Sequence, residues 1–213
     1  MHSFYSHKKH NYFNADYSIF VAEVASTVNE CLVIRDLLNT TEDRAMKGYL
    51  LNHFIDQFRS TVFRQTMFAE FERNIHQMVE AGEALTAENL KSMYYQLNQQ
   101  YHGDAVVSDE EIALEWARIP HFYTPFYVYQ YATGFSAAVA FSEAIFTEGE
   151  PAVQRYLEFL AAGGSDYPLA VLKNAGVYMA SPTPVTKALD FFEQLVTELE
   201  ATVQVSSDHE SKA

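Results

Sequence analysis

Apolar residues recur three and four positions apart along most of the chain, which is the spacing of one face of a helix. This spacing predicts a first helix from Tyr17 to Leu38, which a polar run at residues 39–41 interrupts. A long second helix begins near Glu42 and ends at Gly82. No segment alternates between apolar and polar residues as a half-buried strand would. The pattern therefore predicts an all-α protein.

The later helices are marked by capping residues, prolines and glycines. Ser108 and Glu111 form a capping-box pattern, and Thr86 resembles a helix N-cap. The predicted ranges are about 86–101, a short helix at 112–116, 126–146, 151–162, 168–175 and a last helix after 181–184. We find neither a repeat nor a linker, so we expect a single multi-helix domain at 1–203 and a disordered tail at 204–213.

Composition limits the functions that are open to the chain. Its 213 residues contain 28 acidic and 14 basic side chains, a net charge of −14, which opposes binding to nucleic acid or to an anionic membrane surface. A single cysteine, Cys31, cannot form an intramolecular disulfide. The first residues lack the apolar core of a signal peptide, and no apolar run reaches the roughly 20 residues of a membrane helix. We therefore expect a cytoplasmic protein.

Two carboxylates stand out in the first predicted helix. Glu23 and Glu30 are seven residues apart, so they lie on one helical face two turns from each other. Burial of Glu23 among apolar neighbours would cost several kcal/mol unless a cation or hydrogen bonds compensated it. Glu23 is therefore a candidate metal ligand. The alternative is that both residues form the wet face of an amphipathic helix, and the pattern alone leaves both interpretations open.

A second candidate site is the aromatic segment at residues 120–134, which contains four tyrosines and one histidine within a few turns of chain. Tyrosine hydroxyls donate hydrogen bonds without carrying charge, so beside His121 they suit recognition of peptide carbonyls or of a developing oxyanion. Tyr127 and Tyr131, four residues apart, are expected to share a helix face. The alternative is that they are core residues whose hydroxyls reach water. His7 and His10 are interpreted as solvated histidines near a loop.

Several separate segments together resemble one family, the oligoendopeptidase F branch of the thimet-oligopeptidase-like zinc metallopeptidases. The matching segments are 1–3 (MHS), 16–30 (DYSIFVAEVASTVNE), 118–134 (RIPHFYTPFYVYQYATG), 163–176 (GGSDYPLAVLKNAG) and 181–184 (SPTP). The resemblance covers nearly the whole chain. It implies a hydrolase that cleaves short peptides with one zinc ion per complete enzyme.

The resemblance also assigns roles to individual residues. In the family an HExxH helix supplies two histidine ligands and a general-base glutamate, and a downstream glutamate, matched here by Glu23, is the third ligand. Glu30 matches an acidic position that supports the metal site. His121, Tyr127 and Tyr131 match residues that lie over the tetrahedral intermediate. The register of Tyr123 and Tyr129 against the family is ambiguous.

The chain departs from the family at its start, because it contains no HExxH motif. In the family this motif lies just before the residues matched by Met1–Ser3. The resemblance therefore implies the C-terminal part of a larger helical metallopeptidase, which is inactive alone and has the missing N-terminal half as a partner. Two alternatives remain: a stand-alone helical module that binds peptides or regulates without hydrolysis, and a split protein whose halves reassociate.

Overall fold

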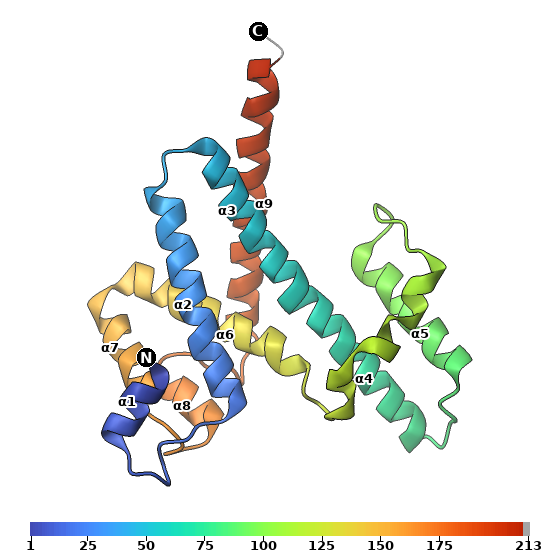
Figure 1. Ribbon diagram of the computed structural model, residues 1–213, viewed down its shortest axis with the longest axis horizontal. Helices are drawn as coiled ribbons and strands as arrows, with labels where there is room; N and C mark the ends of the chain where they lie inside the picture. The colour runs from blue at the N-terminus through green and yellow to red at the C-terminus, as the bar shows by residue number, and fades with distance from the viewer. Residues whose placement is uncertain (211–213) are drawn as a thin grey trace. The chain divides into compact units, whose positions relative to one another are not determined.

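The computed structural model describes residues 1–210, with side chains to residue 204, and every element in this part is helical. The elements are α1 (His2–Lys9), α2 (Ile19–Thr40), α3 (Arg44–Phe58), a π-helical segment (Arg59–Phe63), α4 (Arg64–Glu80), α5 (Ala87–His102), two 3₁₀ segments (Glu110–Arg118 and Pro120–Tyr123), α6 (Tyr129–Glu148), α7 (Glu150–Leu160), α8 (Pro168–Asn174) and α9 (Thr183–Glu210) (Figure 1). The prediction of an all-α fold is confirmed.

Local capping explains where several helices begin. The Ser18 hydroxyl accepts a hydrogen bond from the Val21 amide at the start of α2, and the Thr86 hydroxyl accepts one from the Asn89 amide at the start of α5. The predicted capping box at Ser108 is wrong. This hydroxyl donates to the side-chain oxygen of Asn98 instead, 2.9 Å away, because a tertiary partner on α5 is within reach.

The single helix predicted from Glu42 to Gly82 is divided in the structure. Helices α3 and α4 are separated by the π-helical segment Arg59–Phe63, which contains neither proline nor glycine. A π segment adds one residue to a helical turn, but the apolar residues Phe58, Val62, Phe63 and Met67 continue through it at intervals of four or five, so the hydrophobic pattern does not reveal it.

The chain forms two compact units. Unit 1 contains Met1–Phe58 together with the residues from Thr133 onward, and unit 2 contains Arg59–Ala132. Both boundaries between the units, at residues 58–59 and 132–133, fall in helical segments. No loop with the composition of a linker therefore marks them. The prediction of one domain at 1–203 concerns independent folding and stays a prediction.

The core of unit 1 lies among α2, α6, α7 and α8, which Figure 1 shows in blue, yellow and orange. Val24 and Val28 of α2 are completely buried, and Gly134 of α6 lies against the Val24 side chain. The hydroxyl of Tyr156 on α7 donates to the Ala25 carbonyl at 3.1 Å. These contacts fix α2, the helix that carries Glu23, within this unit.

The loop before α2 is held by two glycines that follow α7. The Gly164 amide donates to the Asn14 carbonyl at 3.0 Å, and Gly163 has a positive φ of 54°. A Cβ atom on Gly164 would lie 2.7 Å from the Asp16 carbonyl oxygen. Only glycine therefore allows the two backbones to approach this closely.

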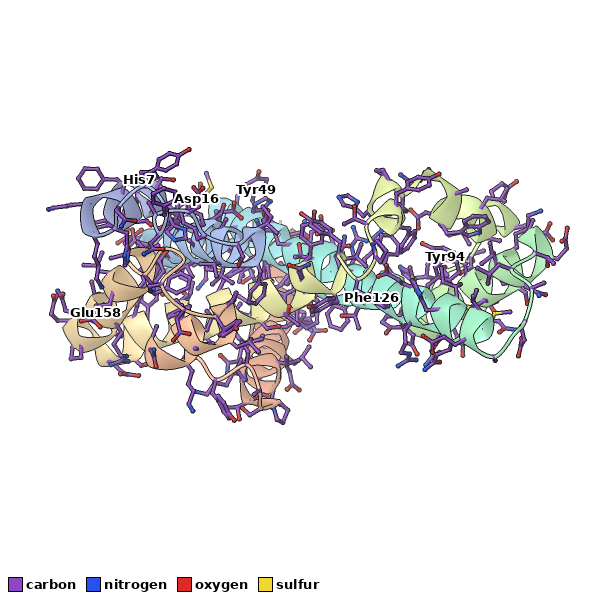
Figure 2. All side chains as sticks on the ribbon, turned by 90° about the horizontal axis from the view of Figure 1, so that it is seen from below. His7, Asp16, Tyr49, Tyr94, Phe126 and Glu158 are labelled. Atoms are coloured by element: carbon purple, nitrogen blue, oxygen red, sulfur yellow. The ribbon has the colours of Figure 1, made fainter. Side chains whose placement is uncertain are left out.

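The core of unit 2 lies between α4 and α5. It contains Phe68 and Phe71 of α4, Tyr94 of α5 and Val128, and the rings of Trp116 and Phe122 pack against it. Tyr94, labelled in Figure 2, is completely buried. Its ring meets that of Phe71 edge-on, with 5.3 Å between the centroids. The core thus holds the turn that precedes α6 against α4.

Helix α9 extends to Glu210, and residues 211–213 of the expected tail lie outside the described residues. The disorder of the tail at 204–213 stays a prediction. In the part of the chain that the structure describes, no helix has both the length and the apolar character needed to cross a membrane.

Candidate active-site residues

Glu23 projects from a helix whose neighbouring positions are in the core. Val24 and Ala25 are buried, whereas Glu23 is half-buried and Glu30, two turns further on, is exposed. Glu30 therefore lies on the solvent-exposed face of the helix, and Glu23 lies at the border between core and surface.

The carboxylate of Glu23 differs from the other carboxylates that are removed from water. Among the side chains of residues 1–204, five carboxylates are not exposed, and four of them have protein partners. The four carboxylates and their partners are Glu70 with Arg73 and Tyr101, Glu72 with the Phe126 amide, Glu115 with Arg64, Arg118 and Tyr94, and Glu143 with Arg35. Within the same residues Glu23 has neither a hydrogen bond nor an ion pair. A half-buried carboxylate without a protein partner is available to a cation.

One carboxylate is not a metal site. The described residues contain no group of three or more histidine, cysteine, aspartate or glutamate side chains that could hold a metal ion. A catalytic zinc site takes three protein ligands. The described part of the chain therefore does not provide a complete zinc site, and Glu23 is the one candidate ligand that the sequence assigned to it.

The structure brings His121, Tyr127 and Tyr131 together. His121 Nε2 lies 3.3 Å from the hydroxyl of Tyr131, which lies 3.5 Å from the hydroxyl of Tyr127. The rings of His121 and Tyr127 stack with an interplanar angle of 10° and a centroid distance of 5.6 Å. Tyr131 stands edge-on to both rings. The three side chains thus form one cluster, which we call the His–Tyr cluster.

The cluster is built differently from the sequence prediction. Tyr131 lies in the first turn of α6, but Tyr127 precedes this helix, which begins at Tyr129. The expectation that the two tyrosines share a helix face is therefore wrong. Their contact comes from the turn before α6, which folds the Tyr127 ring beside that of Tyr131, with 5.4 Å between the centroids.

The order of donors in the cluster leaves one hydroxyl proton for a ligand. Tyr131 donates to the Tyr127 oxygen, so His121 Nε2 serves as the donor to the Tyr131 oxygen when it carries the ring proton. The Tyr127 hydroxyl then keeps its own proton for another acceptor. His121 is exposed and both tyrosines are half-buried, so a ligand can reach this proton.

The other candidates have different surroundings. Tyr123 is 89% exposed and Tyr129 is 48% exposed. His7 is exposed, as predicted, and its Nδ1 lies 2.8 Å from the Ser3 carbonyl within α1. His10, predicted to be solvated, is half-buried, because the loop after α7 packs against it.

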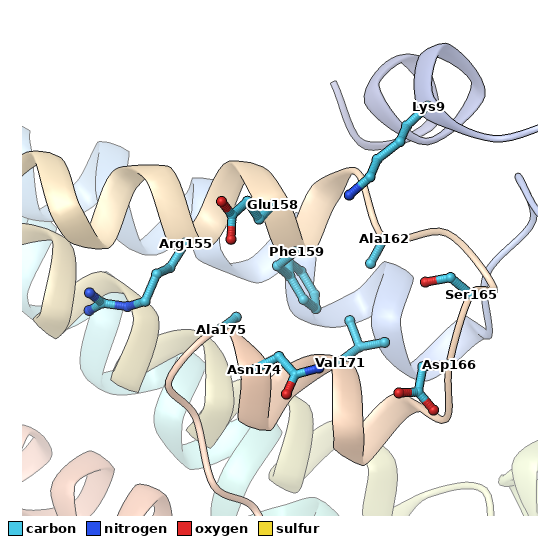
Figure 3. A pocket seen from close by; sticks show the side chains of 10 residues that line it. All are labelled: Lys9, Arg155, Glu158, Phe159, Ala162, Ser165, Asp166, Val171, Asn174 and Ala175. Carbon is cyan, nitrogen blue, oxygen red and sulfur yellow. The ribbon is translucent and has the colours of Figure 1, made fainter.

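A pocket of about 280 Å³ lies among α1, α7 and α8 of unit 1. Figure 3 shows Lys9, Arg155, Glu158 and Asp166 among the side chains that line it. Two cations and two anions leave it without a dominant charge, and none of the predicted site residues belongs to it. This pocket is therefore not the site that the sequence indicates.

Sequence reasoning missed two residues next to the cluster. Glu72 on α4 is buried and accepts a hydrogen bond from the Phe126 amide at 2.8 Å. Phe126 has a positive φ of 57°. The sequence does contain a signal for Glu72: it is four residues after Phe68 and three before Ile75, so its carboxylate occupies the apolar face of the helix.

Comparison with known proteins identifies the family. The model of peptidase family M3 matches residues 1–191. Oligopeptidase PepF of Bacillus subtilis is 56% identical over 94% of this chain, and an oligoendopeptidase F homolog of Lactococcus lactis is 47% identical over 96% of it. The crystal structure of oligoendopeptidase-F from Enterococcus faecium superimposes with a TM-score of 0.86 at 46% identity over 95% of this chain.

The chain spans only part of these relatives. It covers 30% of the Bacillus subtilis protein, 34% of the Lactococcus lactis protein and 37% of the Enterococcus faecium chain. The match nevertheless extends over nearly all of the present sequence, at a level of identity that shows common ancestry. The chain therefore belongs to peptidase family M3, as a member of its oligoendopeptidase F group.

Proposed function

We propose that this chain contributes active-site residues to a zinc-dependent oligopeptidase that hydrolyses short peptides. Glu23 is the metal ligand that it supplies, and the His–Tyr cluster donates a hydrogen bond, through the Tyr127 hydroxyl, to the oxyanion that forms on the scissile carbonyl. The observation that carries the proposal is the cluster itself, in which His121, Tyr131 and Tyr127 are in hydrogen-bonding order. Membership of a peptidase family supports peptides as the substrate.

The cluster suits an oxyanion because its donors are positioned before the reaction. A neutral tyrosine hydroxyl donates without attracting a counter-ion in the resting enzyme, and each positioned donor of this kind contributes about 10²–10³ to the rate in other enzymes. His121 and Tyr131 orient the Tyr127 hydroxyl through the 3.3 Å and 3.5 Å contacts. The Tyr127 oxygen is therefore held beside Tyr131, and its own proton stays available to a ligand.

We further propose that the chain is inactive by itself. It contributes one metal ligand, and its described residues do not complete a metal site. The remaining ligands and the general base would come from a missing N-terminal half that carries HExxH. A cytoplasmic location also stays a prediction from the sequence.

A chimeric enzyme tests the proposal. The chain would replace the matching part of Bacillus subtilis Oligopeptidase PepF, and hydrolysis of a short, internally quenched peptide would be followed along with bound zinc. The isolated chain should show no hydrolysis, and the chimera should be active. Glu23→Ala should release zinc, whereas Tyr127→Phe, which removes the hydroxyl that faces the ligand, should keep zinc and lower kcat about 10²-fold with little change in KM.

Tyr12→Phe is the matched control, because Tyr12 is 85% exposed and lies outside the cluster. It should leave kcat unchanged. An inactive chimera, or full kcat in Tyr127→Phe, would contradict the catalytic role. Peptide binding by the isolated chain, together with an inactive chimera, would instead support the stand-alone binding module.

A further inference from the structure

Glu72 is an unusual residue for the interior of unit 2. Only 3% of its surface is exposed, and it lies on α4 between the buried Phe71 and the half-buried Ile75. A buried carboxylate is unfavourable unless donors compensate it. Its Oε1 accepts the backbone amide of Phe126 at 2.8 Å, across 54 residues of sequence. The side chain is therefore bonded to the turn that carries the His–Tyr cluster.

Phe126 adopts a backbone conformation that large side chains avoid. Apart from glycines, it is the one described residue with a positive φ. Such strain persists only where the surroundings impose it, and it is concentrated at functional sites. The Phe126 ring is also held, with its centroid 4.6 Å from that of His76, one turn after Glu72 on α4.

The turn from Pro120 to Val128 has further attachments to α4 on both sides of Phe126. Before it, the Phe122 ring packs on Phe68 and Phe71, with centroid distances of 5.8 Å and 5.6 Å. After it, Val128 is buried in the core of unit 2. These two contacts hold the ends of the turn by apolar packing, and the hydrogen bond to Glu72 holds the Phe126 amide between them.

We propose that Glu72 is a positioning residue for the His–Tyr cluster: its buried carboxylate holds Phe126 in the left-handed conformation and thereby aims Tyr127. Tyr127 is the next residue, so a change in φ and ψ at Phe126 rotates the peptide that carries it. The hydroxyl would then lose its place beside Tyr131. This inference rests on the proposed function, and it adds the residue that keeps the donors aligned before substrate arrives.

Hydrogen exchange and NMR on the 213-residue chain test the positioning directly. Glu72→Leu keeps the volume of the side chain and removes the acceptor, so the Phe126 amide should exchange about tenfold faster or more, and the Tyr127 ring resonances should shift. Glu72→Gln retains a carbonyl acceptor and should give an intermediate effect. Glu80→Gln, an exposed change on the same helix, is the matched control and should change neither readout.

Activity in the PepF chimera supplies the second readout. Glu72→Leu should lower kcat at least tenfold while KM changes less, because the Tyr127 hydroxyl loses its alignment but the peptide still binds. Adding Phe126→Gly to this variant should recover part of kcat, because glycine adopts the left-handed conformation without the carboxylate. A merely structural role for Glu72 would not give this rescue.

The outcomes separate the two proposals. Unchanged exchange at Phe126 in Glu72→Leu would overturn the positioning role, whatever the activity. Faster exchange with full kcat, in a chimera where Tyr127→Phe is impaired, would also overturn it and would leave the proposed function standing. Full kcat in Tyr127→Phe would overturn the proposed function, while the exchange data would still decide whether Glu72 holds the turn.

Discussion

Replacing Glu115 by glutamine should destabilise unit 2, and the loss should depend on pH. The Glu115 side chain is 9% exposed, and it joins α5 and α4 to the 3₁₀ segment Glu110–Arg118. It accepts a hydrogen bond from the buried Tyr94 hydroxyl at 2.6 Å and pairs with Arg64 and Arg118. One carboxylate thus satisfies three donors from separate parts of the unit.

The magnitude follows from the exposure of each partner. The hydrogen bond from Tyr94 is part-buried and charge-assisted, which corresponds to about 1.5–3 kcal/mol when one partner is lost. The side chains of Arg64 and Arg118 are 32% and 69% exposed, so solvent screens their charges and together they add about 1 kcal/mol or less. Glutamine keeps one oxygen acceptor. The expected loss for Glu115→Gln at neutral pH is therefore about 2 kcal/mol.

The pH dependence has a definite sign. Burial alone would raise the pKa of Glu115, but the hydrogen bond from Tyr94 and the charges of Arg64 and Arg118 outweigh it and hold the pKa below its ordinary value of 4.5. A carboxyl group whose pKa is lower in the folded state stabilises the fold above its unfolded pKa, and this stabilisation disappears as the pH falls through the folded pKa. The difference between the two proteins should therefore shrink in acid.

Urea unfolding provides the assay, followed by the fluorescence of Trp116, the single tryptophan, which packs on the core of unit 2. Free energies of unfolding would be compared near neutral pH and at about pH 3.5. Glu111→Gln, an exposed change in the same segment, is the control. A loss below about 0.5 kcal/mol at neutral pH, or an equal loss at both pH values, would refute the reasoning.

Two further predictions concern unit 1. Gly164→Ala should lower the free energy of unfolding by about 1–3 kcal/mol, because its Cβ would lie 2.7 Å from the Asp16 carbonyl oxygen. Gly48 lies within α3, and its Cβ would meet only an ordinary contact at 3.7 Å, so Gly48→Ala should raise the free energy of unfolding by about 0.5–1 kcal/mol. Thermal denaturation followed by circular dichroism compares the two, and equal effects would contradict the argument. Cys31 is 1% exposed and burial raises the pKa of its thiol to about 12, so a disulfide reagent at mildly alkaline pH should modify it only after urea is added. Rapid modification of the native chain would contradict this prediction.

Local features were predictable because their causes lie within a few residues. The start of α5 follows from the Thr86 hydroxyl, which caps the Asn89 amide three residues later, and the helical spacing of apolar residues gave the all-α fold. Glu23 could be singled out as a carboxylate beside core positions, but its half-burial and its lack of a protein partner required the packing of α2 in unit 1.

The aromatic segment shows the limit of spacing arguments. The sequence indicated that His121, Tyr127 and Tyr131 belong together, but it placed the tyrosines on a helix that in fact begins at Tyr129. Their contact depends on the turn before this helix, and the turn is shaped by apolar packing on α4 and by a hydrogen bond from Phe126 to Glu72.

By itself the sequence determined the helical fold, the capped start of α5 and the residue types of the candidate site, because periodicity and capping act over one or two turns. The tertiary structure alone decided the division into two units, the π-helical segment, the positive φ of Phe126 and its bond to Glu72. These features depend on contacts between residues far apart in the chain, and a carboxylate on a helix face does not reveal which distant amide it will meet.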